Sequence, residues 1–276
     1  MENQQIRKAL RVCAQAVRDT NPLVPAITNV ITIDFVANTQ LACGGSAAMV
    51  YMAEEGEAMA VAGQAIYINM GSMLPVHAEG VPATARACVA AGTPWVLDPV
   101  GIGIGSQRAS ILQQLRDCKP AIIRCNASEA IALADLWGLA CAERDGVRGV
   151  DSTDAVETAR LAAVALARHT GGAVMISGET DLVTDGKQVA LIEGGSELMT
   201  SITGCGCSLG GAAAVFAACG DAFTAALAAA IAYDLAGIDA EADAHGPASF
   251  KVAFIDALYN TAPDDIAAYP FIVEEI

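Results

Sequence analysis

The sequence predicts an α/β protein built on a mostly parallel sheet. Short apolar runs alternate with amphipathic stretches over about two thirds of the 276 residues, and strands separated by helices in this rhythm indicate β-α-β units. The composition agrees, since 54% of the residues are hydrophobic and 17% are charged, which allows a large buried core. No low-complexity linker or internal repeat divides the chain, so we expect one domain over residues 1–276.

The apolar runs are expected to form the strands, and the stretches between them the helices. The expected strands are Leu23–Thr28, Ala47–Val50, Ile66–Met70, Trp95–Pro99, Ala121–Cys125 and Ala173–Ser177. The expected helices are Asp34–Ala42, Pro75–Ala91, Ser106–Asp117, Ala127–Trp137 and Thr153–His169. Gly92 and the Gly171-Gly172 pair follow two of these helices, and glycine commonly ends a helix at such positions.

The last third of the chain has a different pattern. The turn sequence Asp185-Gly186 separates the apolar runs Asp181–Thr184 and Gln188–Ile192, which indicates a β-hairpin. From Gly206 to Thr261 the pattern is almost all helical. The stretch Gly210–Ala232 is mostly alanine, which is weakly hydrophobic, and a glycine and an aspartate interrupt it. We therefore expect two packed helices there, and no membrane span.

Charge and cysteine usage exclude several classes of protein. Acidic residues number 31 and basic residues 15, so the net charge is −16; this surplus repels phosphate backbones, and we expect no nucleic acid partner. The nine cysteines are odd in number and lie mostly in apolar runs, which indicates reduced thiols in a cytoplasmic protein. The start, MENQQIRKAL, lacks the apolar core of a signal peptide. The polar stretch Cys141–Asp154 is expected to be a surface loop.

Polar residues gather where the expected strands end. Open parallel sheets bind ligands at the carboxyl ends of their strands, and all these ends meet at one edge. The residues at or just beyond those ends are Asn29, Asn69, Asp98, Arg124, Asn126, Glu129 and Ser177. The sequence therefore predicts a ligand site at this edge.

Two of these strand ends suggest a magnesium site beside phosphates, although each has a structural alternative. Asp98 is either a ligand of Mg²⁺ or its waters, or a turn residue before proline. Asn126 and Glu129 are three residues apart and form either a capping box or a pair that holds Mg²⁺ through water beside a nucleotide. Arg124 ends an apolar strand, where a guanidinium suits a phosphate better than a core.

The strongest local signal is the glycine-rich turn Thr203–Gly210, TGCGCSLG, which runs straight into an apolar helix. Exposed N–H groups and the positive helix end favour a bound anion, and glycine lets the backbone approach it closely. The alternative is a plain tight turn. Cys207 stands at the helix N-terminus, where the pKa of a thiol is expected to fall. The other cysteines lie in expected core elements, so we do not expect zinc at Cys205 and Cys207.

These motifs, in this order, resemble the hydroxyethylthiazole kinase family. The matching stretches are PLVPAITNVITIDFVANTQLACGGSAAM at 22–49, INMGSM at 68–73, WVLDPVGIG at 95–103, IIRCNASEA at 122–130, VTDG at 183–186 and TGCGCSL at 203–209. Each is short, but together they are specific. The resemblance implies a ribokinase-like, three-layer α/β/α fold with a mostly parallel central sheet. It also implies a cytoplasmic homotrimer with sites between subunits.

The resemblance further implies a reaction and a set of roles. The family transfers the ATP γ-phosphate to the primary alcohol of 4-methyl-5-(2-hydroxyethyl)thiazole, with Mg²⁺, in thiamine biosynthesis and salvage. By resemblance, the residues near the thiazole are Met49, Asn29, Asn69 and Gly204; those near ATP are Arg124, Ser177 and Asn126; those that organise Mg²⁺ are Asp98 and Glu129; and the catalytic turn holds Gly204, Gly206 and Cys207. Sugar kinases of this fold carry an aspartate base where this chain has Cys207, so we expect the thiol to assist catalysis without dominating it.

Three other functions stay open at this point. One is a kinase of the same fold acting on a hydroxymethylpyrimidine or a sugar, although such kinases typically carry Gly-x-Gly-Asp in the catalytic turn. The second is a non-catalytic regulator that binds a nucleotide or a thiazole. The third is a redox or metal protein that uses Cys205 and Cys207.

Overall fold

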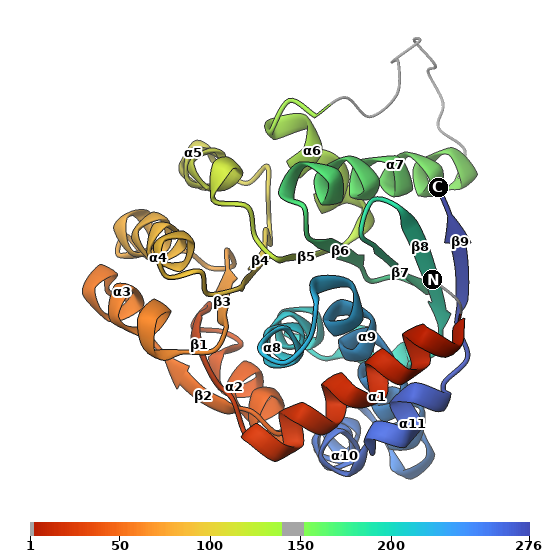
Figure 1. The fold of residues 1–276 in the computed structure, drawn as a ribbon. Coiled ribbons are helices and arrows are strands. Elements are labelled where there is room, and N and C mark those ends of the chain that lie inside the picture. The colour runs from red at the N-terminus through yellow and green to blue at the C-terminus, as the bar shows by residue number, and fades with distance from the viewer. Residues whose placement is uncertain (1–2, 140–151) are drawn as a thin grey trace.

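The computed structural model describes residues 3–139 and 152–276, and the strands in this part of the chain form one nine-stranded sheet (Figure 1). Its order is β2-β1-β3-β4-β5-β6-β7-β8-β9. The strands are β1 (Leu23–Ile27), β2 (Ser46–Met49), β3 (Ile66–Asn69), β4 (Trp95–Asp98), β5 (Ile122–Cys125), β6 (Ala173–Ile176), β7 (Thr180–Thr184), β8 (Gln188–Glu193) and β9 (Ile272–Glu275). Strands β1 to β6 pair in parallel, and β6 to β9 pair antiparallel.

The expected strands and the hairpin are confirmed. At the β7–β8 turn, the Asp185 side chain accepts hydrogen bonds from the backbone N–H groups of Lys187 and Gln188 at 2.9 and 3.0 Å, so this aspartate fixes the turn. Strand β9 was not expected from the sequence. It pairs with β8 and extends the sheet at its antiparallel edge.

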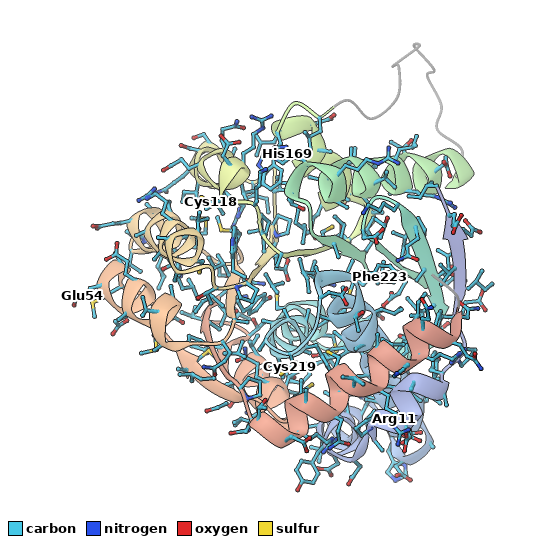
Figure 2. All side chains as sticks on the ribbon, viewed as in Figure 1. Arg11, Glu54, Cys118, His169, Cys219 and Phe223 are labelled. Carbon is cyan, nitrogen blue, oxygen red and sulfur yellow. The ribbon has the colours of Figure 1, made fainter. Side chains whose placement is uncertain are left out.

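Helices cover both faces of the sheet and give three layers (Figures 1 and 2). On one face lie α3 (Ala53–Ala62), α4 (His77–Ala91), α5 (Ser106–Leu115), α6 (Ala127–Leu136) and α7 (Ser152–Thr170), with the short 3-10 turn η1 (Arg116–Cys118) after α5. On the other lie α1 (Asn3–Thr20), α2 (Ile33–Ala42), α8 (Cys205–Ala217), α9 (Ala222–Asp243), α10 (Pro247–Asn260) and α11 (Pro263–Ala268), with η2 (Glu197–Ser201) before α8. The five expected helices are present within a few residues of their bounds, and α1, α3 and α11 are additional.

The two-residue period of the strands sends alternate side chains to the two layers. In β4, Val96 packs into the core shared with α8 and α9, while Trp95 and Leu97 pack into the core of the opposite layer. Asp98 stands two residues after Val96, so it faces the α8 side. By the same count Arg124 faces that side, two residues after Ile122. The strand geometry thus directs the polar strand ends towards one helix.

The alanine-rich run forms two helices, α8 and α9, as expected. Asp221 begins α9 by accepting a hydrogen bond from the N–H of Thr224 at 3.0 Å, which is an N-cap. Within the described residues, α9 is the one helix long and apolar enough to cross a membrane, and 78% of its most apolar 18-residue window is buried inside the fold. It is the central helix of its layer.

Helix α1 connects the start of the chain to its last elements. Its buried side chains recur at helical spacing and face α8, α9 and α11: Ile6, Leu10, Cys13, Ala14 and Val17. Arg7 donates hydrogen bonds to the carbonyls of Ala267 and Tyr269 at 2.6 and 2.8 Å. Arg18 donates in the same way to the carbonyls of Tyr259 and Thr261.

The loop expected over Cys141–Asp154 lies outside the described residues, apart from its end. Residues 152–154 begin α7, so the helix starts one residue before the expected Thr153.

Candidate active site

The ends of β1 and β3 bring two asparagines together beneath α8. The Asn29 amide donates to Asn69 Oδ1 at 3.0 Å and to Thr32 Oγ1 at 2.8 Å. The same amide lies 3.6 Å from the sulfur of Cys207. Both asparagines are almost fully buried, so the expected pair is present and faces the thiol.

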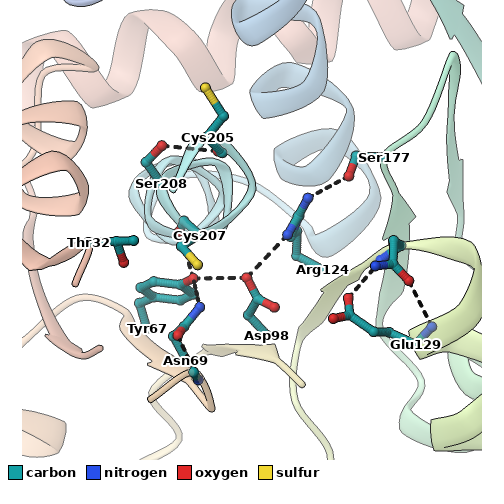
Figure 3. A network of polar contacts seen from close by, with 12 residues as sticks. Thr32, Tyr67, Asn69, Asp98, Arg124, Glu129, Ser177, Cys205, Cys207 and Ser208 are labelled. Carbon is teal, nitrogen blue, oxygen red and sulfur yellow. Dashed lines mark hydrogen bonds and ion pairs between the residues drawn. The ribbon is translucent and has the colours of Figure 1, made fainter. Parts of the chain in front are cut away.

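A buried tyrosine joins this pair to the carboxylate of the next strand (Figure 3). Tyr67 Oη lies 2.6 Å from the carbonyl oxygen of Cys207 and 3.1 Å from Asp98 Oδ2, and it accepts a hydrogen bond from the Asn69 amide at 2.9 Å. Tyr67 was not predicted as a site residue, because an aromatic residue inside an apolar strand is usually core. Its only signal was its spacing, two residues before Asn69.

Asp98 is fully buried at the end of β4, and only one of its two carboxyl oxygens has a partner in the described part of the chain. Its Oδ2 is 3.4 Å from Arg124 Nη1, while its Oδ1 is buried with no hydrogen-bond partner among the described residues. Burial raises the pKa of this carboxyl, and the Arg124 guanidinium opposes the rise. An unpaired buried carboxylate oxygen is costly, which indicates a binding role and argues against a simple turn residue.

Arg124 reaches from β5 to the first turn of α8. Its Nη2 donates to Ser177 Oγ at the end of β6, and its guanidinium lies against Gly206, where an added Cβ would come within 2.6 Å of it. Only glycine at 206 leaves room for the guanidinium. Two of the three residues predicted to bind ATP, Arg124 and Ser177, are therefore in contact with each other, and Arg124 also contacts the glycine-rich turn.

The glycine-rich turn begins α8 as expected. Gly204 is the N-cap with a φ of 98°, a left-handed conformation that favours glycine, and a Cβ there would meet Thr32 at 2.7 Å. The N–H groups of a first helical turn lack partners within the helix, so this end of α8 presents donors to the space beside Arg124.

The expected lowering of the Cys207 pKa is wrong. The thiol is half-buried, and burial raises its pKa, with a further increase from the negative charge of Asp98. These two effects exceed the lowering by the Arg124 charge and by the hydrogen bonds of Asn69 and Thr32, so the thiol stays protonated at neutral pH. Cys207 is placed to donate or accept a hydrogen bond rather than to act as a thiolate.

Asn126 and Glu129 form the capping box that was one of the two interpretations. Asn126 Oδ1 accepts the N–H of Glu129 at 2.9 Å, and Glu129 Oε2 accepts the N–H of Asn126 at 3.0 Å. The other Glu129 oxygen accepts the N–H of Gly101 at 3.2 Å. Glu129 thus ties the loop after β4 to α6, and its negative charge raises the pKa of Asp98, so the two carboxylates are neighbours.

Beside these residues lies a cavity of about 860 Å³. Its lining includes Arg124, Ser177 and Gly206 at one part, the Gly194–Thr200 loop at another, and Asp234 of α9. The volume is large enough for a nucleotide, since small-molecule sites commonly measure about 300–1,000 Å³. Asp234 was not predicted as a site residue, although a lone aspartate within an alanine-rich helix is a usable signal.

The donors at the edge of the sheet fit Mg²⁺. Magnesium prefers carboxylate oxygens and keeps several waters. Asp98 Oδ1 is free to bind it, and Glu129, whose oxygens both accept backbone N–H groups, has lone pairs left for water. Met49, the remaining predicted residue, ends the edge strand β2 and is half-buried, paired in register with Ala26 of β1. It lies at the same edge of the sheet, outside the hydrogen-bonded cluster.

Comparison with known proteins agrees with this geometry. Residues 14–264 match the model of the Hydroxyethylthiazole kinase family. Hydroxyethylthiazole kinases from Bifidobacterium animalis subsp. lactis and Cereibacter sphaeroides are 44% and 45% identical to this chain, over 96% and 90% of its length and 91% and 92% of theirs.

Solved structures support the same assignment. The hydroxyethylthiazole kinase protein of Pyrococcus horikoshii OT3 superimposes with a TM-score of 0.86 at 28% identity, over 98% of this chain and 99% of that one. A pyridoxal kinase from Staphylococcus aureus, at 15% identity and a TM-score of 0.60 over 92% and 99% of the two chains, shares the fold. The expected ribokinase-like fold is confirmed. The chain is a kinase, and it belongs to the hydroxyethylthiazole kinase family.

Proposed function

We propose that this chain transfers the γ-phosphoryl group of ATP, with Mg²⁺, to the primary alcohol of 4-methyl-5-(2-hydroxyethyl)thiazole. The product would be the thiazole phosphate used in thiamine biosynthesis and salvage. One observation carries the proposal: a continuous set of contacts runs from Asn69 through Tyr67, Asp98 and Arg124 to Ser177. It links a thiol-lined acceptor end to a nucleotide-sized cavity beneath one helix N-terminus.

The acceptor alcohol would lie near Cys207, Asn29 and Asn69, with Met49 against the thiazole ring and Gly204 beside the hydroxyl. Asn29 already bonds Thr32 and Asn69, so its orientation is fixed before substrate arrives. Such preorganisation lowers the entropic cost of aligning the alcohol with the phosphate. Because Cys207 remains a thiol, its role would be to hold the hydroxyl in place.

The triphosphate would lie in the cavity with its reacting end at the first turn of α8. Arg124 and Ser177 would bind phosphate oxygens. Asn126, the third residue predicted near ATP, is the N-cap of α6, two residues after Arg124. The N–H groups of Gly206 and Cys207 would stabilise the charge that develops on the transferred phosphoryl group. Little covalent chemistry is required of the protein in phosphoryl transfer, where positioning and charge stabilisation dominate.

Magnesium would be held by Asp98 directly and by Glu129 through water. When bound, the ion would neutralise part of the negative charge of the phosphates. Arg124 would then leave Asp98 and bind the phosphates, since its side chain contacts Asp98 and also lines the cavity.

The experiment is a kinase assay read by mass spectrometry, with ATP and Mg²⁺ and the acceptors hydroxyethylthiazole, hydroxymethylpyrimidine, ribose and none. We expect a phosphorylated thiazole alone. Phosphorylation of another alcohol would keep the kinase but change its acceptor. ATP turnover with no phosphorylated acceptor would contradict the proposal and favour a nucleotide-binding regulator.

We also propose a cytoplasmic homotrimer with acceptor sites at its interfaces. The loops after β1, β2 and β3 each expose a large apolar side chain beside the acceptor end: Ile31 at 66%, Met52 at 47% and Leu74 at 41%. Exposed apolar groups around a site indicate a protein interface. Light scattering coupled to gel filtration should give three times the chain mass, and a monomer would contradict the assembly without affecting the reaction.

A further inference from the structure

The part of the cavity away from the glycine-rich turn is acidic. Five carboxyl side chains belong to the cavity lining, against the single guanidinium of Arg124 among the described residues: Glu179, Asp181, Glu197, Asp234 and Glu241. Triphosphates are anions, so this acidic part does not suit them. It suits a group that offers hydrogen-bond donors.

Asp234 stands out among these acids because the described residues offer its buried oxygen no hydrogen-bond partner. Its side chain is only 5% exposed, and its Oδ2 is buried with no hydrogen-bond partner among the described residues. By contrast, Asp181, which is 7% exposed, accepts a hydrogen bond from the N–H of Gly178 at 2.9 Å. A buried and unpaired carboxyl in a cavity wall points to a ligand that supplies the missing partner.

The backbone opposite Asp234 is shaped to leave room for its carboxyl. A Cβ on Gly194 would clash with the Tyr269 hydroxyl and come within 2.8 Å of Asp234 Cβ. A Cβ on Gly195 would come within 3.1 Å of Met199 Sδ and 3.2 Å of Asp234 Oδ1. One turn later in α9, a Cβ on Gly237 would come within 2.9 Å of Gly195 Cα. Three glycines therefore let the loop after β8 lie directly on α9 at this carboxyl.

The glycine contacts place Asp234 beside the loop after β8, in the same cavity wall as Gly194 and Gly195. The residues proposed to bind the phosphates, Arg124 and Ser177, contact each other instead, and Arg124 contacts the first turn of α8. With the phosphates at Arg124 and the first turn of α8, the part of the cavity beside Asp234 is left for the nucleoside of a bound nucleotide.

We propose that Asp234 recognises the base of the phosphate donor by a hydrogen bond with the exocyclic amino group of a purine. This inference rests on the proposed function, because it takes the cavity as the nucleotide site. An exocyclic amine is the donor that an aminopurine offers to a carboxyl oxygen. The acidity of the surrounding lining disfavours bases whose edges carry only acceptors.

The state of the carboxyl supports this pairing. Burial, followed by the charge of Asp181, raises the pKa of Asp234 to about 8, so the acid is mostly protonated at neutral pH. A neutral carboxylic acid presents one donor and one acceptor side by side. Asparagine and glutamine present the same pair when they recognise adenine.

The test compares ADP with purine riboside diphosphate, which lacks only the 6-amino group. Binding of each to the whole protein is measured by calorimetry with Mg²⁺ and no acceptor, for wild type, Asp234→Ala, Asp234→Asn and Glu241→Gln. We expect wild type to bind ADP about tenfold more tightly, the effect of one hydrogen bond. Asp234→Ala should abolish this ratio. Asp234→Asn, which keeps an acceptor, and Glu241→Gln, which removes an exposed acid of the same cavity, should preserve it.

Two results would overturn the proposal. If Asp234→Ala weakens both diphosphates by the same factor, the carboxyl contacts the ribose or acts only structurally. If the Ala and Asn variants both keep the wild-type ratio, Asp234 does not contact the amine. Because no acceptor is present, failure to phosphorylate the thiazole leaves this test intact, whereas failure of wild type to bind either diphosphate removes the nucleotide site and both proposals with it.

Discussion

Tyr67 shows at the scale of one residue how the two halves of the site are held together. A phenol has one proton and can donate only one strong hydrogen bond. Its hydroxyl is closer to the Cys207 carbonyl, at 2.6 Å, than to Asp98 Oδ2, at 3.1 Å. Donation to the carbonyl therefore fixes the first turn of α8 over β3, and the charge of Asp98 stays available to a metal ion.

Tyr67→Phe should lower kcat about tenfold and increase the Mg²⁺ concentration needed for half-maximal rate. It should also lower the free energy of unfolding by about 1–3 kcal/mol, the cost of leaving buried groups unpaired. Steady-state kinetics over a range of Mg²⁺ and urea unfolding would measure both. Tyr233→Phe is the matched control for unfolding, because the Tyr233 hydroxyl is buried with no hydrogen-bond partner among the described residues. If both variants lowered the free energy of unfolding by the same amount, the Tyr67 hydroxyl would not hold the first turn of α8 in place.

Cys207→Ala should lose less than about tenfold in kcat, whereas Asp98→Asn should lose about 10²-fold or more, a typical loss when preorganised charge stabilisation is removed. The reason is that burial keeps Cys207 a neutral thiol, while Asp98 carries the charge that faces the metal. Initial rates at saturating ATP and thiazole would compare them. If the two variants lost the same activity, Cys207 would be the catalytic base.

At the scale of elements, the site depends on how closely β5 approaches α8. The Arg124 guanidinium fills the position that a side chain at 206 would occupy. The glycine-rich turn is thus required for the packing of an arginine as well as for the approach of a phosphate.

Gly206→Ala should raise the KM for ATP at least about tenfold, because the new methyl group would displace Arg124 and weaken a charge-assisted contact with phosphate. The KM for the thiazole should change little. Gly211→Ala, five residues further along α8, is the control for adding a methyl group to this helix, since its Cβ would meet the Val36 and Gln40 side chains at 3.0 to 3.7 Å and would not meet Arg124. An unchanged KM for ATP in Gly206→Ala would show that Arg124 does not bind the nucleotide.

The sequence predicted best the elements whose apolar residues recur regularly and whose apolar run stops at a polar residue. The strands of the parallel part were predicted because each apolar run stops at a polar residue such as Asn69 or Asp98. Helix α1 was not expected, although its apolar residues have helical spacing. Strand β9 was missed because its pairing with β8 is a contact between residues about 80 apart in sequence. Tyr67 and Asp234 were missed for one reason: local pattern does not show which core positions face a cavity.

Across the whole molecule, buried acids set the pH dependence of stability. The pKa of Asp181 is raised to about 6 and that of Asp234 to about 8, both mainly by burial. In the unfolded chain these carboxyls titrate near 3.9. Between these values the native state binds more protons than the unfolded state, so the free energy of unfolding falls as pH rises.

We therefore expect the melting temperature to decrease from pH 5 to pH 8. The decrease should be smaller in Asp234→Asn, which keeps the shape of the side chain and removes its ionisation. Thermal unfolding followed by circular dichroism at several pH values would measure this. The net charge of −16 also favours unfolding as pH rises, and for this reason the difference between variant and wild type is the decisive quantity. Parallel curves for the two proteins would show that Asp234 titrates normally.

The docking of α1 against the end of the chain has a consequence for biosynthesis. The carbonyls that receive Arg7 and Arg18 lie between residues 259 and 269, so the docking surface of α1, which also includes α8 and α9, stays incomplete until those residues have been synthesised. At about 5–20 residues per second the wait is roughly 10–50 s. During most of that interval the apolar face of α1 is open to chaperones. A nascent chain stalled before residue 259 should therefore be cleaved within α1 by a protease that spares the released protein.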